Sequence, residues 1–78
     1  MIRTQAGEVP VNSTLLAKVA YEAGQSTLQL EFCNGAIYRY LAVPADIYHG
    51  LLSADSKGTY FNHKIRNRFD YVLLRRPQ

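Results

Sequence analysis

Alternating apolar and polar residues fill the first half of the chain and predict an antiparallel β-meander. Three runs alternate in this way, at 17–22, 27–33 and 36–41. Turn-forming residues separate the first two runs, and Asn34-Gly35 separates the second from the third. Because successive side chains of a strand point to opposite faces, this pattern predicts a three-stranded sheet with one buried face.

The Asn34-Gly35 pair predicts a two-residue hairpin turn in which both residues adopt positive φ. A turn of this length sets the register, so that Leu30 faces Arg39. The expected core face then holds Ala17, Val19, Tyr21, Leu28, Leu30, Phe32, Ile37 and Leu41. Arg39 is the one misfit on this face, and we expect it to reach the sheet edge or to pair with an acid.

The opposite face of the predicted sheet is polar apart from two tyrosines. Its members are Lys18, Ala20, Glu22, Gln29, Glu31, Tyr38 and Tyr40. In one interpretation, Tyr38 and Tyr40 pack against the N-terminal arm, the C-terminal tail or a second subunit. In the other, they form a stacking platform for bases, as aromatic residues on sheets do in single-strand binders.

The second half of the chain predicts two helices. Pro44 suits the first position of a helix over 44–54, because its missing N–H would have no partner there. A second helix is expected over 57–67, where Phe61 and Ile65 recur at helical spacing and define its inward face. Together these elements predict an α+β fold, a three-stranded antiparallel meander packed against two helices.

The remaining segments are less regular. Residues 1–10 are polar and are expected to form a flexible arm. The stretch 11–16 fits either a short edge strand or one helical turn. The apolar stretch 71–74 is expected to be a short extra strand or an oligomer contact, and 75–78 to be a basic tail. These limits predict a single domain over 11–74.

Positive charge is concentrated at the C-terminal end of the chain. Residues 57–78 contain six Lys and Arg residues against Asp70 alone, a net charge of +5, whereas residues 1–56 carry −2. A basic half beside a mildly acidic half suits an anionic partner, with nucleic acid as the first choice. The alternative is an ordinary solvated surface.

No catalytic motif accompanies these features. Cys33 is the single cysteine, which excludes an intrachain disulfide and a zinc site built from cysteines. It is expected on the polar sheet face, whereas His49 and His63 belong to the helices, so no Cys–His pair is predicted. The acids are scattered, and no glycine-rich phosphate loop is present. We therefore expect no enzyme activity, no cofactor and no metal.

The lone thiol, together with the absence of targeting signals, indicates a cytoplasmic protein. No apolar run approaches the roughly 18 residues that a membrane span needs. The N-terminal segment also lacks the apolar centre of a secretory signal.

The start of the second predicted helix has the composition of an anion site. Ser56-Lys57-Gly58 combines free backbone N–H groups, a cation and little steric obstruction. Further basic residues of this segment are Lys64, Arg66 and Arg68. Asn62 is a candidate for contact with a base edge. The structural alternative makes Ser56 a helix cap, Gly58 a packing residue and Asn62 a buried amide.

The chain resembles the KTSC domain family, named for its occurrence at the C-terminus of some lysyl-tRNA synthetases. The matching segments are Val11-Asn12-Ser13-Thr14, Gly35-x-x-Tyr38-Arg39-Tyr40, Val43-Pro44, Leu51-Leu52-x-Ala54-x-Ser56-Lys57-Gly58-x-Tyr60-Phe61-Asn62, Ile65-Arg66 and Phe69. They cover about residues 11–71, and the extension 72–78 lies outside the pattern. The resemblance implies a small free-standing bacterial or phage protein of unknown function, with RNA binding suggested partly by the attachment to a tRNA enzyme.

Two functional hypotheses follow. The first is a small binding module for RNA or single-stranded nucleic acid, or another anionic ligand. Its predicted binding residues are Tyr38, Tyr40, Ser56, Lys57, Gly58, Asn62, Lys64, Arg66 and Arg68. The second is a protein-interaction or homodimerisation module with no nucleic-acid role, in which the tyrosines and 72–74 form the contact.

Overall fold

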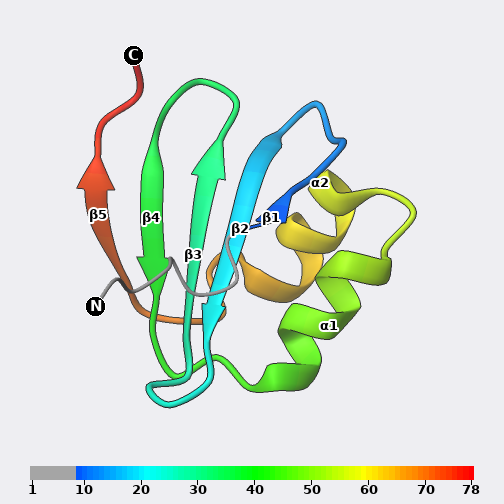
Figure 1. The fold of residues 1–78 in the computed structure, drawn as a ribbon, viewed down its shortest axis with the longest axis vertical. Coiled ribbons are helices and arrows are strands. Elements are labelled where there is room, and N and C mark those ends of the chain that lie inside the picture. The colour runs from blue at the N-terminus through cyan, green and yellow to red at the C-terminus, as the bar shows by residue number, and fades with distance from the viewer. Residues whose placement is uncertain (1–8) are drawn as a thin grey trace, which may run out of the picture.

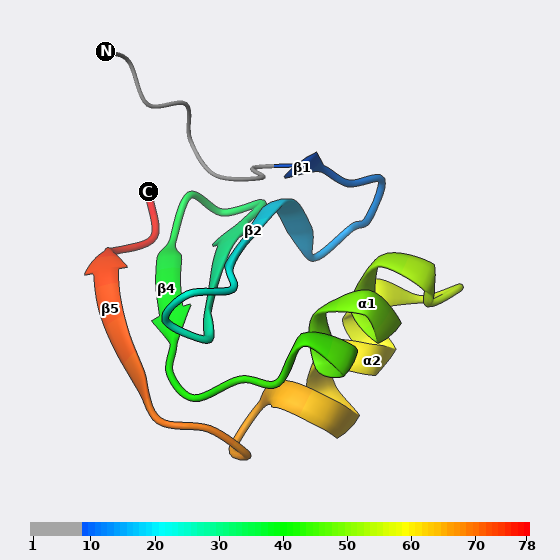
Figure 2. The same ribbon diagram turned by 60° about the horizontal axis from the view of Figure 1, so that its bottom comes forward.

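A computed structural model describes residues 9–78 and shows one antiparallel sheet with helices on one of its faces (Figures 1 and 2). The five strands follow the chain order across the sheet: β1 (Val9–Pro10), β2 (Leu16–Glu22), β3 (Thr27–Phe32), β4 (Ile37–Tyr40) and β5 (Tyr71–Arg75). The predicted α+β architecture is confirmed, and the three-stranded meander is the centre of a larger sheet.

Two helical segments follow the meander. The first is α1 (Ala45–Ser53), close to the predicted bounds. The second begins as one α-helical turn, α2 (Lys57–Tyr60), and continues directly as a π-helix, η1 (Phe61–Ile65). The wider turn is closed by the N–H of Arg66, which donates to the carbonyl of Phe61 at 2.8 Å.

The predicted register between the second and third strands is wrong by one residue. Leu30 lies opposite Tyr38 rather than Arg39. The turn is longer than expected, because the N–H of Phe32 donates to the carbonyl of Ala36 at 2.8 Å and leaves three residues in the loop. Only Gly35 in that loop has positive φ, at 94°. Such three-residue loops end in a residue with positive φ, a position that favours glycine.

This shift exchanges the two faces of β4, because a one-residue slip reverses every side chain of a strand. Tyr38 and Tyr40 lie on the helix-facing side of the sheet, not on the polar side. Ile37 moves to the polar side, where Arg39 donates to Gln29 at 3.3 Å. The misfit of Arg39 therefore disappears, and its predicted place in the core was an error of register.

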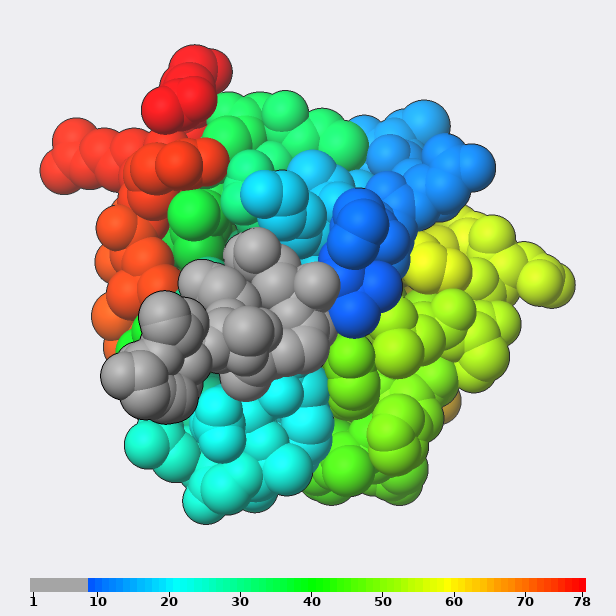
Figure 3. All heavy atoms as spheres, viewed as in Figure 1, coloured from blue at the N-terminus to red at the C-terminus, as the bar shows by residue number. Residues whose placement is uncertain are grey.

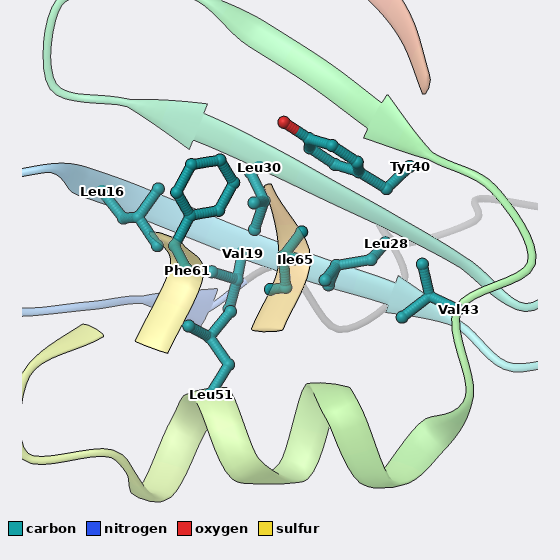
Figure 4. Close-up of a cluster of buried hydrophobic side chains, with 9 residues drawn as sticks. All are labelled: Leu16, Val19, Leu28, Leu30, Tyr40, Val43, Leu51, Phe61 and Ile65. Carbon is teal, nitrogen blue, oxygen red and sulfur yellow. The ribbon is translucent and has the colours of Figure 1, made fainter. Parts of the chain in front are cut away.

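The core lies between the sheet and the helices (Figure 4). Its buried cluster comprises Leu16, Val19, Leu28, Leu30, Tyr40, Val43, Leu51, Phe61 and Ile65. Leu16 takes the place predicted for Ala17, because a bulge in β2 shifts the register after Leu16. Ile37 and Leu41, both predicted as core residues, are not among the side chains packed on this cluster.

The segments outside the meander also differ from expectation. Val9–Pro10 form β1 against β2, and the rest of the predicted arm lies outside the described residues. Residues 11–15 are neither strand nor helical turn; the Ser13 hydroxyl accepts hydrogen bonds from the N–H groups of Leu15 and Leu16. The predicted strand near 71–74 is present as β5, which also includes Arg75.

Close approach of the two helical segments depends on a glycine. The hydroxyl of Tyr60 donates to the carbonyl of Ile47 at 3.0 Å, and its ring lies directly against Gly50. A methyl group at Gly50 would lie 2.8 Å from the Tyr60 Cζ atom, too close for any real contact. Among residues 9–78, no helix is long and apolar enough to cross a membrane.

Candidate functional site

A groove of about 490 Å³ lies between η1 and the strands β4 and β5. Its lining residues are Leu15, Phe32, Asn34, Ala36, Tyr38, Tyr40, Phe61, Asn62, Arg66, Asn67, Tyr71 and Pro77. We call it the aromatic groove and use the name for the site formed by Tyr38, Tyr40, Tyr71, Asn62 and Arg66. Its volume falls within the range of about 300 to 1,000 Å³ that is typical of ligand sites.

Three tyrosine rings form one wall of the aromatic groove. Tyr38 and Tyr40 stack with ring centroids 6.1 Å apart, because alternate residues of β4 share a face. Tyr71 lies opposite Tyr40 in the β4–β5 ladder and is 5.2 Å from the ring of Tyr38. Tyr40 is only 5% exposed, whereas Tyr71 is 57% exposed. The wall therefore runs from a buried ring to an open one.

Two phenylalanines anchor this wall to the core. Phe32 makes edge-to-face contacts with Tyr38 and Phe61, with centroids 5.6 and 5.3 Å apart. Phe61 in turn contacts Tyr40 edge-to-face at 6.0 Å. Edge-to-face pairs of this kind are stabilising beyond the area they bury. The tyrosines are thus held in place by packing before any ligand is present.

The other wall of the aromatic groove is polar. Arg66 donates to the side-chain oxygen of Asn62 at 3.4 Å, and both residues are exposed. Asn62 belongs to η1, and Arg66 is the residue directly after the last residue of η1. The π-helix therefore places an amide and a guanidinium opposite the rings. Short π-helical segments occur frequently at functional sites.

The groove is electrostatically asymmetric. Burial raises the pKa of Tyr40 to about 12, with the neighbouring hydroxyls of Tyr38 and Tyr71 adding to the rise and Arg66 opposing it. Tyr40 is therefore neutral at pH 7 and can donate a hydrogen bond. Within residues 9–78, no hydrogen bond joins the three tyrosine hydroxyls to another group. A ligand would meet unused hydroxyls on one wall and a cation on the other.

Four of the predicted binding residues meet in the aromatic groove: Tyr38, Tyr40, Asn62 and Arg66. The sequence placed the two tyrosines on the polar face of the sheet, away from the helices. The register shift brings them to the helix side, which is why they lie beside Asn62 and Arg66. Tyr71 was not predicted as a site residue. The sequence signal that could have identified it is a tyrosine directly before the aliphatic residues 72–74 of β5.

The predicted anion site at the start of the second helix is separate from the aromatic groove. Ser56, Lys57 and Gly58 line a separate hollow of about 320 Å³, together with residues 12–14 and Asp55. The Ser56 hydroxyl accepts a hydrogen bond from the N–H of Thr59 at 3.2 Å and caps α2.

The ammonium of Lys57 is engaged within the fold. It donates to the carbonyls of Leu52 and Ala54 at 3.2 and 3.0 Å. A cation at the end of α1 satisfies carbonyls that the helix leaves without partners and complements its dipole. Lys57 therefore has a structural role in joining α1 to α2.

The last two predicted basic residues flank the aromatic groove without lining it. Lys64 borders a shallow hollow with His63 and Tyr60. Arg68 borders an open hollow of about 700 Å³ beside Asp70, and Tyr71 is shared between this hollow and the groove. Among the described residues, no three His, Cys, Asp or Glu side chains come together as a metal site would require.

Comparison with known proteins identifies relatives over most of the chain. The family description "KTSC domain" matches residues 12–69. A KTSC domain protein from Yersinia pestis has a solved structure with a TM-score of 0.82 and 29% identity, covering 87% of this chain and 96% of that one. An uncharacterized protein of Stutzerimonas stutzeri is 44% identical over 54 residues, which are 69% of this chain and 76% of the relative.

A second group of relatives consists of much longer proteins. A lysine–tRNA ligase of Trichormus variabilis is 36% identical over 61 residues, or 78% of this chain. A lysine–tRNA ligase of Nostoc sp. is 45% identical over 54 residues, or 69% of this chain. The matched parts are only 11% and 10% of the two ligases, so the similarity does not extend to most of their length.

Proposed function

This chain belongs to the KTSC domain family, and we propose that it binds single-stranded nucleic acid, RNA in particular, in the aromatic groove. One observation carries the proposal. Tyr38, Tyr40 and Tyr71 lie together across from Asn62 and Arg66, so that aromatic faces and a cation line the same hollow. Proteins that bind single strands combine stacking surfaces with cations along the backbone path.

Each part of the groove has a defined role in this proposal. The exposed ring of Tyr71 and the half-buried ring of Tyr38 are the stacking surfaces. Stacking of one base on such a ring contributes about 1–3 kcal/mol. The guanidinium of Arg66 binds the phosphate beside that base through charge-assisted hydrogen bonds. Asn62 offers a donor and an acceptor to the edge of an unpaired base.

The charge distribution and the lysine–tRNA ligase relatives support the same proposal. The net charge of +5 over residues 57–78 attracts a polyanion toward the part of the chain that contains Arg66 and Tyr71. Relatives of this domain also occur within enzymes named for joining lysine to tRNA. That occurrence supports nucleic-acid binding by association only. The physical support comes from the tyrosine rings and the guanidinium of the aromatic groove.

The test measures the affinity of the full chain for short single-stranded RNA. Fluorescence anisotropy with labelled adenine and uracil oligonucleotides, repeated between about 50 and 200 mM salt, gives the affinity and its salt slope. Arg66→Ala should weaken binding about tenfold and make the salt slope shallower, because one phosphate contact is lost. Tyr71→Leu should weaken binding by a similar factor while leaving the salt slope unchanged, since it removes stacking only.

A matched control separates the groove from net charge. Arg39→Ala removes the same charge from the opposite face of the sheet, where the Arg39 guanidinium donates a hydrogen bond to the side chain of Gln29. It should reduce the affinity much less than Arg66→Ala. If the wild-type chain fails to bind at low salt, or if both arginine variants lose affinity equally, the aromatic groove is not a nucleic-acid site.

A further inference from the structure

Within residues 9–78, the outer edge of β5 is unpaired and its side chains are largely apolar. β5 pairs with β4 on one side, and no described strand lies on its other side (Figure 1). Its first four residues, Tyr71 to Leu74, are each between 43% and 57% exposed. Natural proteins usually protect such an edge with charges, prolines or a covering segment. In β5, by contrast, the exposed residues from Tyr71 to Leu74 are apolar or aromatic and include neither a charge nor a proline.

The backbone at this edge has free hydrogen-bonding groups. The N–H of Leu41 donates to the carbonyl of Asp70 at 2.9 Å, so the polar groups of Asp70 face β4. In an antiparallel ladder this orientation alternates along the strand. The N–H and C=O groups of Tyr71 and Leu73 therefore face outward. A further strand would find two donors and two acceptors there.

The C-terminal residues do not cover this edge. After β5 the chain turns toward the β3–β4 loop, where the N–H of Gln78 donates to the carbonyl of Asn34 at 2.7 Å. The space-filling view shows the tail beside that loop, with β5 along one margin of the molecule (Figure 3). The edge of β5 is thus left open by the segment that follows it.

The charges around β5 are complementary to those of a second, antiparallel copy of the same segment. Residues 70–76 read DYVLLRR, with an acid at the start and two bases at the end. If two copies lie antiparallel with Leu73 opposite Leu73, Asp70 of each copy lies near Arg76 of the other. A parallel arrangement would instead align like charges. Neither Asp70 nor Arg76 has an ion-pair partner within residues 9–78.

We propose that two copies of this chain pair through β5, antiparallel, about a two-fold axis at Leu73. The contact joins two five-stranded sheets into one continuous sheet and puts the helices of both copies on the same face. Hydrogen bonds between the two Leu73 residues and the contact of their side chains form its centre. The two Asp70–Arg76 pairs lie at its ends and set the direction of the strands.

The geometry also limits the strength of the pairing. A bulge at Leu74 shifts the β4–β5 register between Tyr38 and Ile37, and bulges interrupt regular pairing. The contact is therefore short, and a dissociation constant in the micromolar range is expected. Because Leu73 is on the same face as Tyr71, the second copy extends the exposed apolar surface beside the aromatic groove.

Sedimentation velocity between about 1 μM and 1 mM tests the pairing. The wild-type chain should shift from monomer to dimer over this range. Leu73→Lys puts two like charges at the axis and should leave a monomer, whereas Thr59→Lys adds the same charge on exposed α2 and should dimerise normally. Circular dichroism verifies that each variant is folded. A wild-type chain that stays monomeric throughout overturns the proposal, as does a Leu73→Lys variant that still dimerises.

Charge reversal tests the predicted direction. Asp70→Arg and Arg76→Asp should each weaken dimerisation about tenfold, because each puts like charges at both ends of the contact. The double variant should regain dimerisation, since the pairs are re-formed with exchanged signs. Failure of the double variant to regain it would exclude this register. Arg66→Ala leaves β5 intact and should dimerise normally, so the outcome is independent of nucleic-acid binding.

Discussion

Leu30 lies opposite Tyr38 in the β3–β4 ladder, and both side chains point toward the helices. This pairing decides where the candidate site is. With Arg39 in that position, both tyrosines of β4 would face away from the helices. The three-residue loop that ends at Gly35 is responsible, because it adds one residue to the expected turn.

Replacement of Gly35 by alanine should destabilise the fold by about 1–2 kcal/mol, because its φ of 94° is strained for any residue with a Cβ atom. The added methyl would also lie 2.9 Å from the Gln78 side chain. Gly24→Ala is the control, since Gly24 has no positive φ and its nearest neighbour would be 3.5 Å away. Urea unfolding compares the two; equal midpoints would show that the loop tolerates another conformation.

Gly50→Ala should also destabilise the protein, by about 1–3 kcal/mol, although alanine is the better helix former. The methyl would displace the ring of Tyr60 and break its hydrogen bond to the carbonyl of Ile47. Gly58→Ala in α2 is a matched control, because its methyl would meet Leu15 at an ordinary 3.6 Å. Thermal unfolding should show a lower midpoint for Gly50→Ala alone, and a midpoint raised by both substitutions would disprove this packing.

Lys57→Ala should lower the free energy of unfolding by about 1 kcal/mol, because two carbonyls at the end of α1 lose their donor. Lys64→Ala removes the same charge from an exposed position and should leave stability nearly unchanged. Denaturant titration measures both variants. If the two losses are equal, the ammonium of Lys57 contributes only through its net charge.

The stability of the protein should decline at alkaline pH through Tyr40. Its pKa is raised to about 12 by burial, so the folded state holds the proton more tightly than the unfolded chain does. The stabilisation that the protonated Tyr40 hydroxyl gives the folded state is complete below the unfolded pKa of about 10, and it is lost as pH rises through the folded pKa of about 12. Part of the effect is screened by solvent in the groove, so we expect a loss of about 1–2 kcal/mol.

Tyr40→Phe is the control for this pH dependence, because it removes the ionising hydroxyl and keeps the ring. Unfolding free energies measured from pH 9 to about 12 should fall less steeply for Tyr40→Phe than for the wild-type chain. Tyr48→Phe serves as a second control, because Tyr48 stacks on Tyr21 away from the aromatic groove. It should leave the pH dependence of the unfolding free energy close to that of the wild-type chain. Parallel curves for wild type and Tyr40→Phe would contradict the assignment.

Much of this architecture follows from local sequence. The alternation in three runs predicted the central strands to within one or two residues, and Pro44 marked the start of α1. The same pattern predicted Val19, Leu28 and Leu30 as core residues, which they are. These features depend on side-chain periodicity and on residues with restricted backbone angles, both of which act over a few positions.

The arrangement of the site depends on contacts between distant segments. The Asn34-Gly35 pair fits both a two-residue and a three-residue loop, and the two differ in which face carries Tyr40. Burial of that ring against Phe61 favours the longer loop, since it adds an aromatic side chain to the core and leaves Arg39 in solvent. The sequence by itself therefore determined the three central strands, the two helical segments, the short strand near 71–74 and four of the five residues that define the groove, but neither β1 nor the role of Tyr71. Only tertiary packing decided that the tyrosines of β4 and β5 meet Asn62 and Arg66 in one groove.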